Sequence, residues 1–184
     1  GNNINSDFWV LEHLPHTMFA EPSGDAIDHY HRYADDIARL AELGFNSYRF
    51  SIEWARVEPE EGFFSTAILD HYRRMLETCH THGLKPMVTL HHFTSPRWLV
   101  AQGGWTDAET AVKFARYAAR VTRDLGDLVE RICTINEMNI PTMAKLFWHP
   151  NVSEEAAIQQ RAFEISAAKA FGVSREKFAP FMFA

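Results

Sequence analysis

The segment that decides the fold is VERICTINE, residues 129–137, a short apolar run that ends abruptly in the pair Asn136-Glu137. Such a run is typical of a buried β-strand. In a barrel of parallel strands, the chemistry takes place at the carboxyl ends of the strands. We therefore expect Glu137 to be partly desolvated at a strand tip, where a carboxylic acid can donate a proton near neutral pH. The alternative is a surface glutamate that happens to follow a strand.

The same arrangement occurs three times along the chain. Three amphipathic stretches end at Gly44, Gly83 and Gly126, and a strand-like run follows each glycine, at residues 45–52, 85–90 and 129–135. Glycine is favoured in the left-handed conformation just past a helix. Helix–glycine–strand units of about 40 residues build parallel α/β structures. The sequence therefore predicts an α/β fold, either a (β/α) barrel or a doubly wound sheet.

The helical stretches have apolar residues at helical spacing, which we expect to form the core rather than to contact a cofactor. Thr106 and Glu109 have the spacing of a capping box at the start of the third helix. Ser153 is expected to cap a further helix from residue 154 to about 171, closed by Gly172. The apolar stripes are Tyr33, Ile37, Leu40 and Ala41; Ile68, Tyr72, Met75, Leu76 and Cys79; and Phe114, Tyr117, Ala118, Val121 and Leu125.

Polar side chains follow all three predicted strands. The stretches are SIEWAR (residues 51–56), HHFTSP (residues 91–96) and NEMN (residues 136–139). If the strands are parallel, these groups gather at one end of the sheet. Together with nearby aromatic rings they would line a polar pocket of the kind that binds sugars, with rings against C–H faces and polar groups on hydroxyls. Trp98, Trp105 and Trp148 lie on the loops beyond these strands and could help to line the rim of the pocket.

Several longer motifs resemble the N-terminal half of glycoside hydrolase family 1, the retaining β-glucosidase family. The resemblance implies a (β/α)8 TIM barrel, of which residues 1–184 would form one partial domain with about three strands, the second to the fourth. The motifs occur in the family's order and spacing: DHYHRY (28–33), YRFSIEWAR (48–56), VTLHHF (88–93), GGW (103–105), FARYA (114–118), GD (126–127) and TINE (134–137).

The resemblance also implies a role for individual residues. Glu137 would be the general acid that protonates the glycosidic oxygen and then the base that activates water. Asn136 would bind the sugar 2-hydroxyl, His92 would bind another glycone hydroxyl, and Trp105 would help to build the glycone pocket. Arg49 would lie under the site and hold the nucleophilic carboxylate in its ionised form.

Three positions depart from the family pattern. Phe93 stands where the family usually has tryptophan, so the apolar platform that it would offer the sugar is altered. Glu53 stands where the family often has serine, and Met138 follows the acid/base glutamate in place of the commoner proline. None of these changes removes a catalytic group.

The nucleophile that the family carries in a Glu-Asn-Gly context does not occur in the sequence. A retaining glycosidase needs two carboxyl groups about 5–5.5 Å apart, so we expect the nucleophile, the first strand and the second half of the barrel to lie outside these residues. The 184 residues alone are then expected to be inactive. An inactive truncated or sugar-binding remnant is one alternative function. A metal-dependent barrel hydrolase is another, suggested by the pairs His29/His31 and His91/His92.

Composition favours a globular cytoplasmic enzyme, with 46% hydrophobic and 23% charged residues. A net charge of −6 without a basic cluster argues against a nucleic-acid partner. No apolar run reaches the roughly 20 residues that a membrane span needs. Cys79 and Cys133 are expected to be buried thiols in a reducing compartment. We expect a small β-glycoside as the partner and no metal or cofactor, while the identity of the sugar and the oligomeric state stay open.

Overall fold

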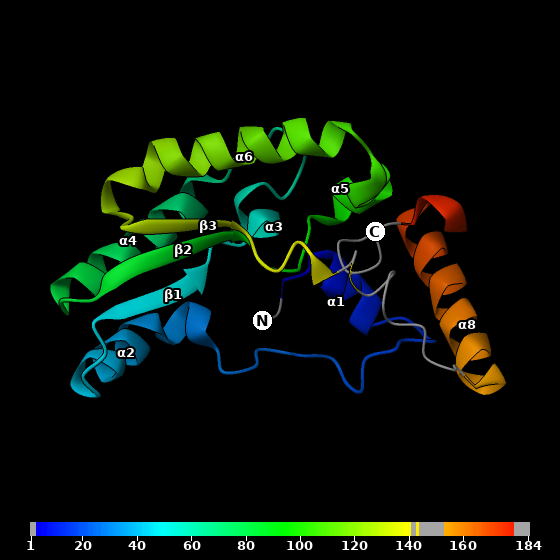
Figure 1. Ribbon diagram of the computed structural model, residues 1–184, viewed down its shortest axis with the longest axis horizontal. Helices are drawn as coiled ribbons and strands as arrows, with labels where there is room; N and C mark the ends of the chain where they lie inside the picture. The colour runs from blue at the N-terminus through cyan, green and yellow to red at the C-terminus, as the bar shows by residue number, and fades with distance from the viewer. Residues whose placement is uncertain (1–2, 141–142, 144–152, 179–184) are drawn as a thin grey trace.

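A computed structural model of the chain describes residues 3–140, 143 and 153–178 (Figure 1). In these residues a parallel sheet has the strand order β1-β2-β3. The strands are β1 (Ser47–Ser51), β2 (Lys85–His91) and β3 (Arg131–Ile135). Ser47 lies opposite Lys85, and Met87 lies opposite Arg131. All three predicted strands are therefore confirmed, with ends that differ by no more than two residues.

Helices connect the consecutive strands. α2 (His29–Glu42) precedes β1, α4 (Thr66–Thr81) links β1 to β2, and α6 (Glu109–Leu125) links β2 to β3. The other helices are α1 (Asp7–Glu12), α3 (Trp54–Val57), α5 (Arg97–Ala101) and α8 (Glu154–Phe171), with short 3-10 helices η1 (Gly104–Thr106), η2 (Gly126–Leu128) and η3 (Arg175–Lys177). None of the described helices is long and apolar enough to cross a membrane.

The main hydrophobic core lies between one face of the sheet and the helices α2, α4 and α6. Alternate strand residues point into it, among them Phe50, Val88 and Leu90, because side chains of a strand alternate between its two faces. The helices meet them with the stripes predicted from helical spacing, all of whose residues belong to this core or pack against it. The strand residues that alternate with these core residues, such as Arg49 and Thr89, point to the opposite face of the sheet.

Two local predictions at helix ends are wrong. Gly44 and Gly83 have the expected left-handed φ of 85° and 72°, but Gly126 has a right-handed φ of −61° because the chain continues into η2 before it turns. No capping box forms at the start of α6. The Thr106 hydroxyl donates instead to the Gly103 carbonyl at 3.1 Å, and Asp107 Oδ1 accepts the Glu109 N–H at 3.1 Å.

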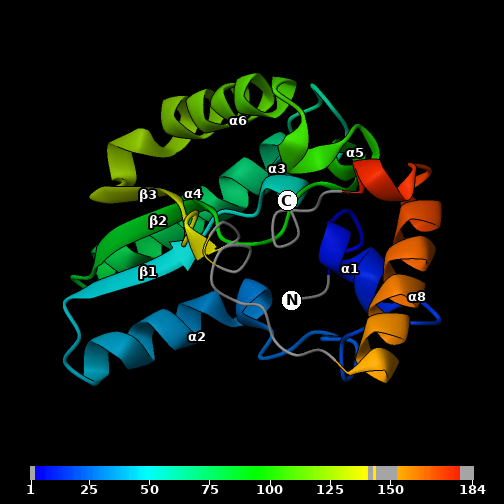
Figure 2. The ribbon, with the colours of Figure 1, turned by 45° about the vertical axis from the view of Figure 1, so that its right-hand side comes forward.

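A second hydrophobic cluster joins α8 to α1 and α5, away from the sheet (Figure 2). Ser153 Oγ accepts the Ala156 N–H at the start of α8, and Gly172 ends it with a left-handed φ of 69°. Both predicted ends of this helix are therefore confirmed. The buried members of the cluster are Leu11, Val100, Phe163, Ala167, Ala168, Phe171 and Phe178.

Candidate active site

The predicted site residues meet at the carboxyl ends of β2 and β3. The Asn136 N–H donates to the His91 carbonyl at 2.9 Å, so the pairing of the two strands continues one residue past the end of β3. This places Asn136 beside His92, with 3.5 Å between Asn136 Nδ2 and His92 Nε2. Asn136 is buried at 7% exposure, whereas His92 is exposed.

Arg49 reaches this point from β1. Its Nε donates to Thr89 Oγ1 at 2.7 Å and its Nη2 donates to Asn136 Oδ1 at 2.5 Å. One side chain thus joins all three strands on the face opposite the main core. Because a guanidinium can only donate, it fixes the amide of Asn136 with its oxygen toward Arg49 and its NH₂ group toward His92.

The charge state of His92 follows from its neighbours. Although His92 is exposed as a residue, desolvation of its ring by the surrounding groups lowers the pKa of the imidazole, the positive charge of Arg49 lowers this pKa further, and the carboxylate of Glu137 raises it. The net direction is downward, so His92 is neutral at neutral pH. A neutral imidazole has one donor and one acceptor nitrogen, which suits it to a sugar hydroxyl that both donates and accepts.

Glu137 follows Asn136 in a turn at the end of the edge strand β3. Its φ is 48°, a left-handed conformation that is uncommon outside glycine. Its side chain is exposed, so the expected partial burial is wrong for the described residues. The physical reason is that β3 has a neighbouring strand on one side only. The carboxyl group lies close enough to His92 to act on its titration.

The two aromatic residues of the prediction lie at different depths. The Phe93 ring meets the His92 ring edge-on, with 4.7 Å between the centroids. The Trp105 ring packs on His91, with a centroid distance of 4.6 Å, and its Nε1–H donates to Ser95 Oγ at 2.8 Å. Phe93 therefore belongs to the group around His92. Trp105 contacts the buried residues His91 and Ser95 behind that group.

Polar residues to which the sequence interpretation gave no individual role support this end of the sheet. Thr89 and Ser95 are fully buried and bind Arg49 and Trp105. Asp7 on α1 is also fully buried, and desolvation together with the charge of Glu53 raises the pKa of its carboxyl group to about 8. Burial raises the pKa of Glu53 as well, although Thr94 donates to its Oε2 at 2.8 Å. The alternation of side chains along the strand could have predicted the position of Thr89. No sequence pattern indicates that Asp7 is buried.

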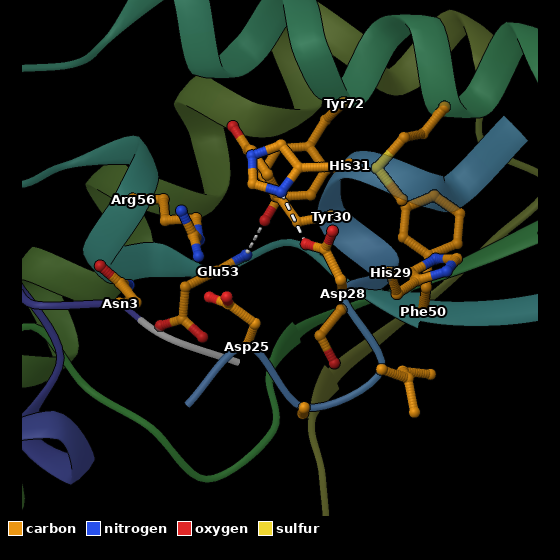
Figure 3. Close-up of a pocket in the computed structure, with 14 residues that line it drawn as sticks. Asn3, Asp25, Asp28, His29, Tyr30, His31, Phe50, Glu53, Arg56 and Tyr72 are labelled. Atoms are coloured by element: carbon orange, nitrogen blue, oxygen red, sulfur yellow. Dashed lines mark hydrogen bonds and ion pairs between the residues drawn. The ribbon is translucent and has the colours of Figure 1, made fainter. Parts of the chain in front are cut away.

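A pocket of about 270 Å³ lies beside the tip of β1, away from this group (Figure 3). It contains none of the residues given a role in sugar binding or catalysis, although Ser51, Glu53 and Arg56 of the first predicted strand tip line it. Its contacts are internal to the fold: Arg56 lies over the Tyr30 ring at 4.2 Å, and the Glu53 N–H donates to the Tyr72 hydroxyl at 3.0 Å. The candidate site at the strand tips is the exposed group next to Asn136, rather than this pocket.

The histidine pairs behind the metal alternative have separate partners. His29 contacts Asp36 and Tyr48, His31 contacts Asp28, and His91 contacts Ser95, whereas His92 faces Asn136. In the part of the chain that the structure describes, no three His, Cys, Asp or Glu side chains form a group that could hold a metal ion.

Comparison with known proteins adds independent evidence. The family described as "Glycosyl hydrolase family 1" matches residues 4–177. "Thermostable beta-glucosidase B" of Thermobispora bispora is 44% identical over 130 residues, which are 70% of this chain and 28% of that enzyme.

Among solved structures, the β-glycosidase BGL167 superimposes with a TM-score of 0.91 and 55% identity, covering 100% of this chain and 44% of that one. The apo structure of a β-glucosidase named 1317 gives a TM-score of 0.90 and 47% identity, again over 44% of its length. The chain thus spans less than half of each of these relatives. Their fold is the (β/α)8 barrel, so the three-stranded sheet is confirmed as an incomplete portion of a TIM barrel.

Proposed function

The chain belongs to glycosyl hydrolase family 1, and from this premise we propose that the whole protein hydrolyses β-glucosides or related β-glycosides with retention of configuration. Residues 1–184 would be part of a single barrel domain. The observation that carries the proposal is the contact chain Arg49–Asn136–His92 beside Glu137. These contacts bring together, at the strand tips, the groups that would bind sugar hydroxyls next to an accessible carboxyl group. The names of the relatives, which include β-glucosidases, support the substrate class.

Glu137 would act as the acid/base residue. In the first step its carboxylic acid protonates the glycosidic oxygen while a second carboxylate attacks the anomeric carbon. In the second step the Glu137 carboxylate takes a proton from a water molecule. That water attacks the anomeric carbon and releases the sugar from the second carboxylate, the nucleophile. We propose that this nucleophile comes from a part of the protein outside residues 1–184. Exposure of Glu137 allows both a leaving group and water to reach it.

Asn136 would bind the sugar 2-hydroxyl. Arg49 holds its Oδ1, so its NH₂ group is the part that can be offered to a ligand. A hydrogen bond to the 2-hydroxyl strengthens as the oxocarbenium-like transition state develops. His92 would bind a second hydroxyl, and the Phe93 ring beside it would lie against apolar C–H groups of the sugar, with Trp105 behind them.

The test of the proposal is Glu137→Gln in the full-length protein. Hydrolysis of alkyl β-glucosides should fall by about 10³-fold, because these leaving groups need protonation. Aryl glycosides with good leaving groups should lose less in the first step, and azide should partly restore turnover because it needs no base. Glu130→Gln, an exposed glutamate at the other end of β3, is the matched control and should leave turnover unchanged. Equal losses on all substrates with no azide effect would remove Glu137 from this role.

A second candidate is sugar binding without hydrolysis by residues 1–184 alone. It is favoured by the fact that Arg49, Asn136 and His92 are already assembled in this part of the barrel. Binding of a β-glucoside to the isolated chain without turnover would support it. We also propose a cytoplasmic location, supported by Cys79 and Cys133, which form no disulfide.

A further inference from the structure

Ser95 lies at the centre of a buried hydrogen-bond network behind the candidate site. It is 0% exposed and belongs to the loop between β2 and α5, three residues after His92. The Trp105 Nε1–H donates to Ser95 Oγ at 2.8 Å, and His91 Nε2 lies 3.1 Å from the same oxygen. One hydroxyl thus connects the indole of Trp105 to the strand residue that precedes His92.

The direction of the hydrogen bond to Trp105 follows from the groups involved. An indole N–H can only donate, so Ser95 Oγ is the acceptor toward Trp105. The serine hydroxyl can donate its own proton to His91 Nε2 or accept a second proton from it, so the direction of this hydrogen bond follows the tautomer of His91. Burial, helped by the neighbouring His92, lowers the pKa of His91 to about 3, so this imidazole is neutral. Ser95 Oγ therefore holds the Nε2 side of the His91 ring.

Asp7 holds the main chain of Ser95 from both sides. The Asp7 N–H donates to the Ser95 carbonyl at 2.9 Å, and the Ser95 N–H donates to Asp7 Oδ1 at 2.9 Å. Thr94, which precedes Ser95, is also anchored, because its Oγ1 donates to Glu53 Oε2 at 2.8 Å. Asp7, which is buried on α1, and Glu53, which is half-buried and precedes α3, thus fix the loop directly after His92 and Phe93. The position of these two residues depends on that anchoring.

We propose that Ser95 is a positioning residue for sugar binding. Its hydroxyl fixes the Trp105 indole and the His91 imidazole, while Asp7 anchors its main chain, and these contacts together hold His92 and Phe93 toward the sugar. Ser95 itself does not touch the substrate. The proposal rests on the proposed function for the identity of the ligand, but the ring positions that Ser95 fixes are measurable without any substrate.

The experiment compares Ser95→Ala with Ser95→Thr and Ser65→Ala in the full-length protein. Ser65 Oγ caps α4 by accepting the Ile68 N–H, so its removal is a matched loss of a structural hydroxyl. The readouts are the indole N–H resonance of Trp105, assigned by its absence in Trp105→Phe, the ¹⁵N resonances of His91, and kcat and KM for an aryl β-glucoside.

Ser95→Ala should shift the indole resonance of Trp105 and the Nε2 resonance of His91, because both lose their hydrogen bond to the hydroxyl. It should raise KM about 10-fold with kcat changed less than about twofold, because binding contacts are lost in ground and transition state alike. Ser95→Thr keeps the hydroxyl and should restore both resonances. Ser65→Ala should lower stability without these changes. If Ser95→Ala fails to fold, Trp105→Phe removes the donor on the other side and should alter the His91 resonances.

Unchanged resonances and KM in Ser95→Ala would overturn the proposal, as would equal effects of Ser95→Ala and Ser65→Ala. If the wild-type protein hydrolyses no β-glycoside, the proposed function fails, and the resonances of Trp105 and His91 still decide whether Ser95 positions the two rings.

Discussion

Arg49 donates a hydrogen bond to Asn136 across 87 residues of sequence, with 2.5 Å between Nη2 and Oδ1. The contact runs from β1 to the tip of β3 and passes Thr89 on β2, which accepts from Nε of the same guanidinium. The orientation of the proposed sugar-binding amide is therefore set by a residue two strands away. This relationship gives Arg49 a role that does not depend on the nucleophile.

Replacement of Arg49 by methionine in the full-length protein should lower kcat/KM by about 10²-fold, because the Asn136 amide loses the group that orients it. The acidic limb of the pH–rate profile should also move to higher pH, since the proposed nucleophile would lose a nearby positive charge. Arg49→Lys keeps the charge but replaces the two donor nitrogens, Nε toward Thr89 and Nη2 toward Asn136, with a single ammonium nitrogen. It should therefore retain the acidic limb and still lose affinity. An acidic limb that does not move in Arg49→Met would make Arg49 a purely structural residue.

Arg116→Ala should destabilise the fold by about 2 kcal/mol, because it leaves a buried carboxylate without its cation. Glu58 is 0% exposed and accepts from Arg116, from Trp54 Nε1 at 2.8 Å and from the Gly62 N–H at 2.7 Å. Because Arg116 is partly exposed, the loss of stability should be smaller than for a fully buried ion pair. Urea unfolding measures the change in the free energy of unfolding.

The matched control for that change is Arg123→Ala. Arg123 contacts Asp124 at 3.1 Å, but its side chain is 68% exposed. Exposed ion pairs contribute at most about 1 kcal/mol, so the midpoint of unfolding should hardly move. Equal losses for Arg116 and Arg123 would contradict the special position of Glu58.

The sequence predicted the strands, the apolar stripes of the helices and, through the family resemblance, the group Arg49, Asn136 and His92. Periodicity and chain order carry that information. It did not predict the contact between Asp7 and Ser95, which lie 88 residues apart, because nothing in the local pattern around Asp7 distinguishes a buried aspartate from a helix-start residue. The exposure of Glu137 was missed for a similar reason: it depends on which strands flank β3, and a single segment does not contain that fact.

Asp7 should make stability fall as the pH rises. Its pKa is raised from 3.8 to about 8 in the folded protein, so the folded state keeps a proton that the unfolded chain releases. The stabilisation is complete below about pH 4 and is lost as the pH rises to about 8. Asp7→Asn keeps an oxygen for the Ser95 N–H but cannot ionise. Its melting temperature should therefore decline less between pH 5 and pH 9 than that of the wild type. Asp35→Asn, on the exposed side of α2, is the control and should follow the wild type. Parallel pH curves for Asp7→Asn and the wild type would show that Asp7 does not carry this dependence.

Residues 1–184 on their own should bind a hydrophobic dye and hydrolyse no β-glucoside. β1 and β3 are both edge strands of the described sheet, and unpaired edges with apolar side chains promote association. Near the β3 edge, Ile132 is 40% exposed and Met138 is 66% exposed. Turnover should be absent because the proposed nucleophile, which would form the glycosyl-enzyme, lies outside these residues. Size-exclusion chromatography, dye fluorescence and an aryl β-glucoside assay test this directly.

Ile132→Thr keeps a β-branched residue in the strand and should reduce dye binding, whereas Val112→Thr, an exposed change on α6, should not. A monodisperse monomer with turnover that disappears in Glu137→Gln would contradict the prediction and would place the nucleophile within this chain.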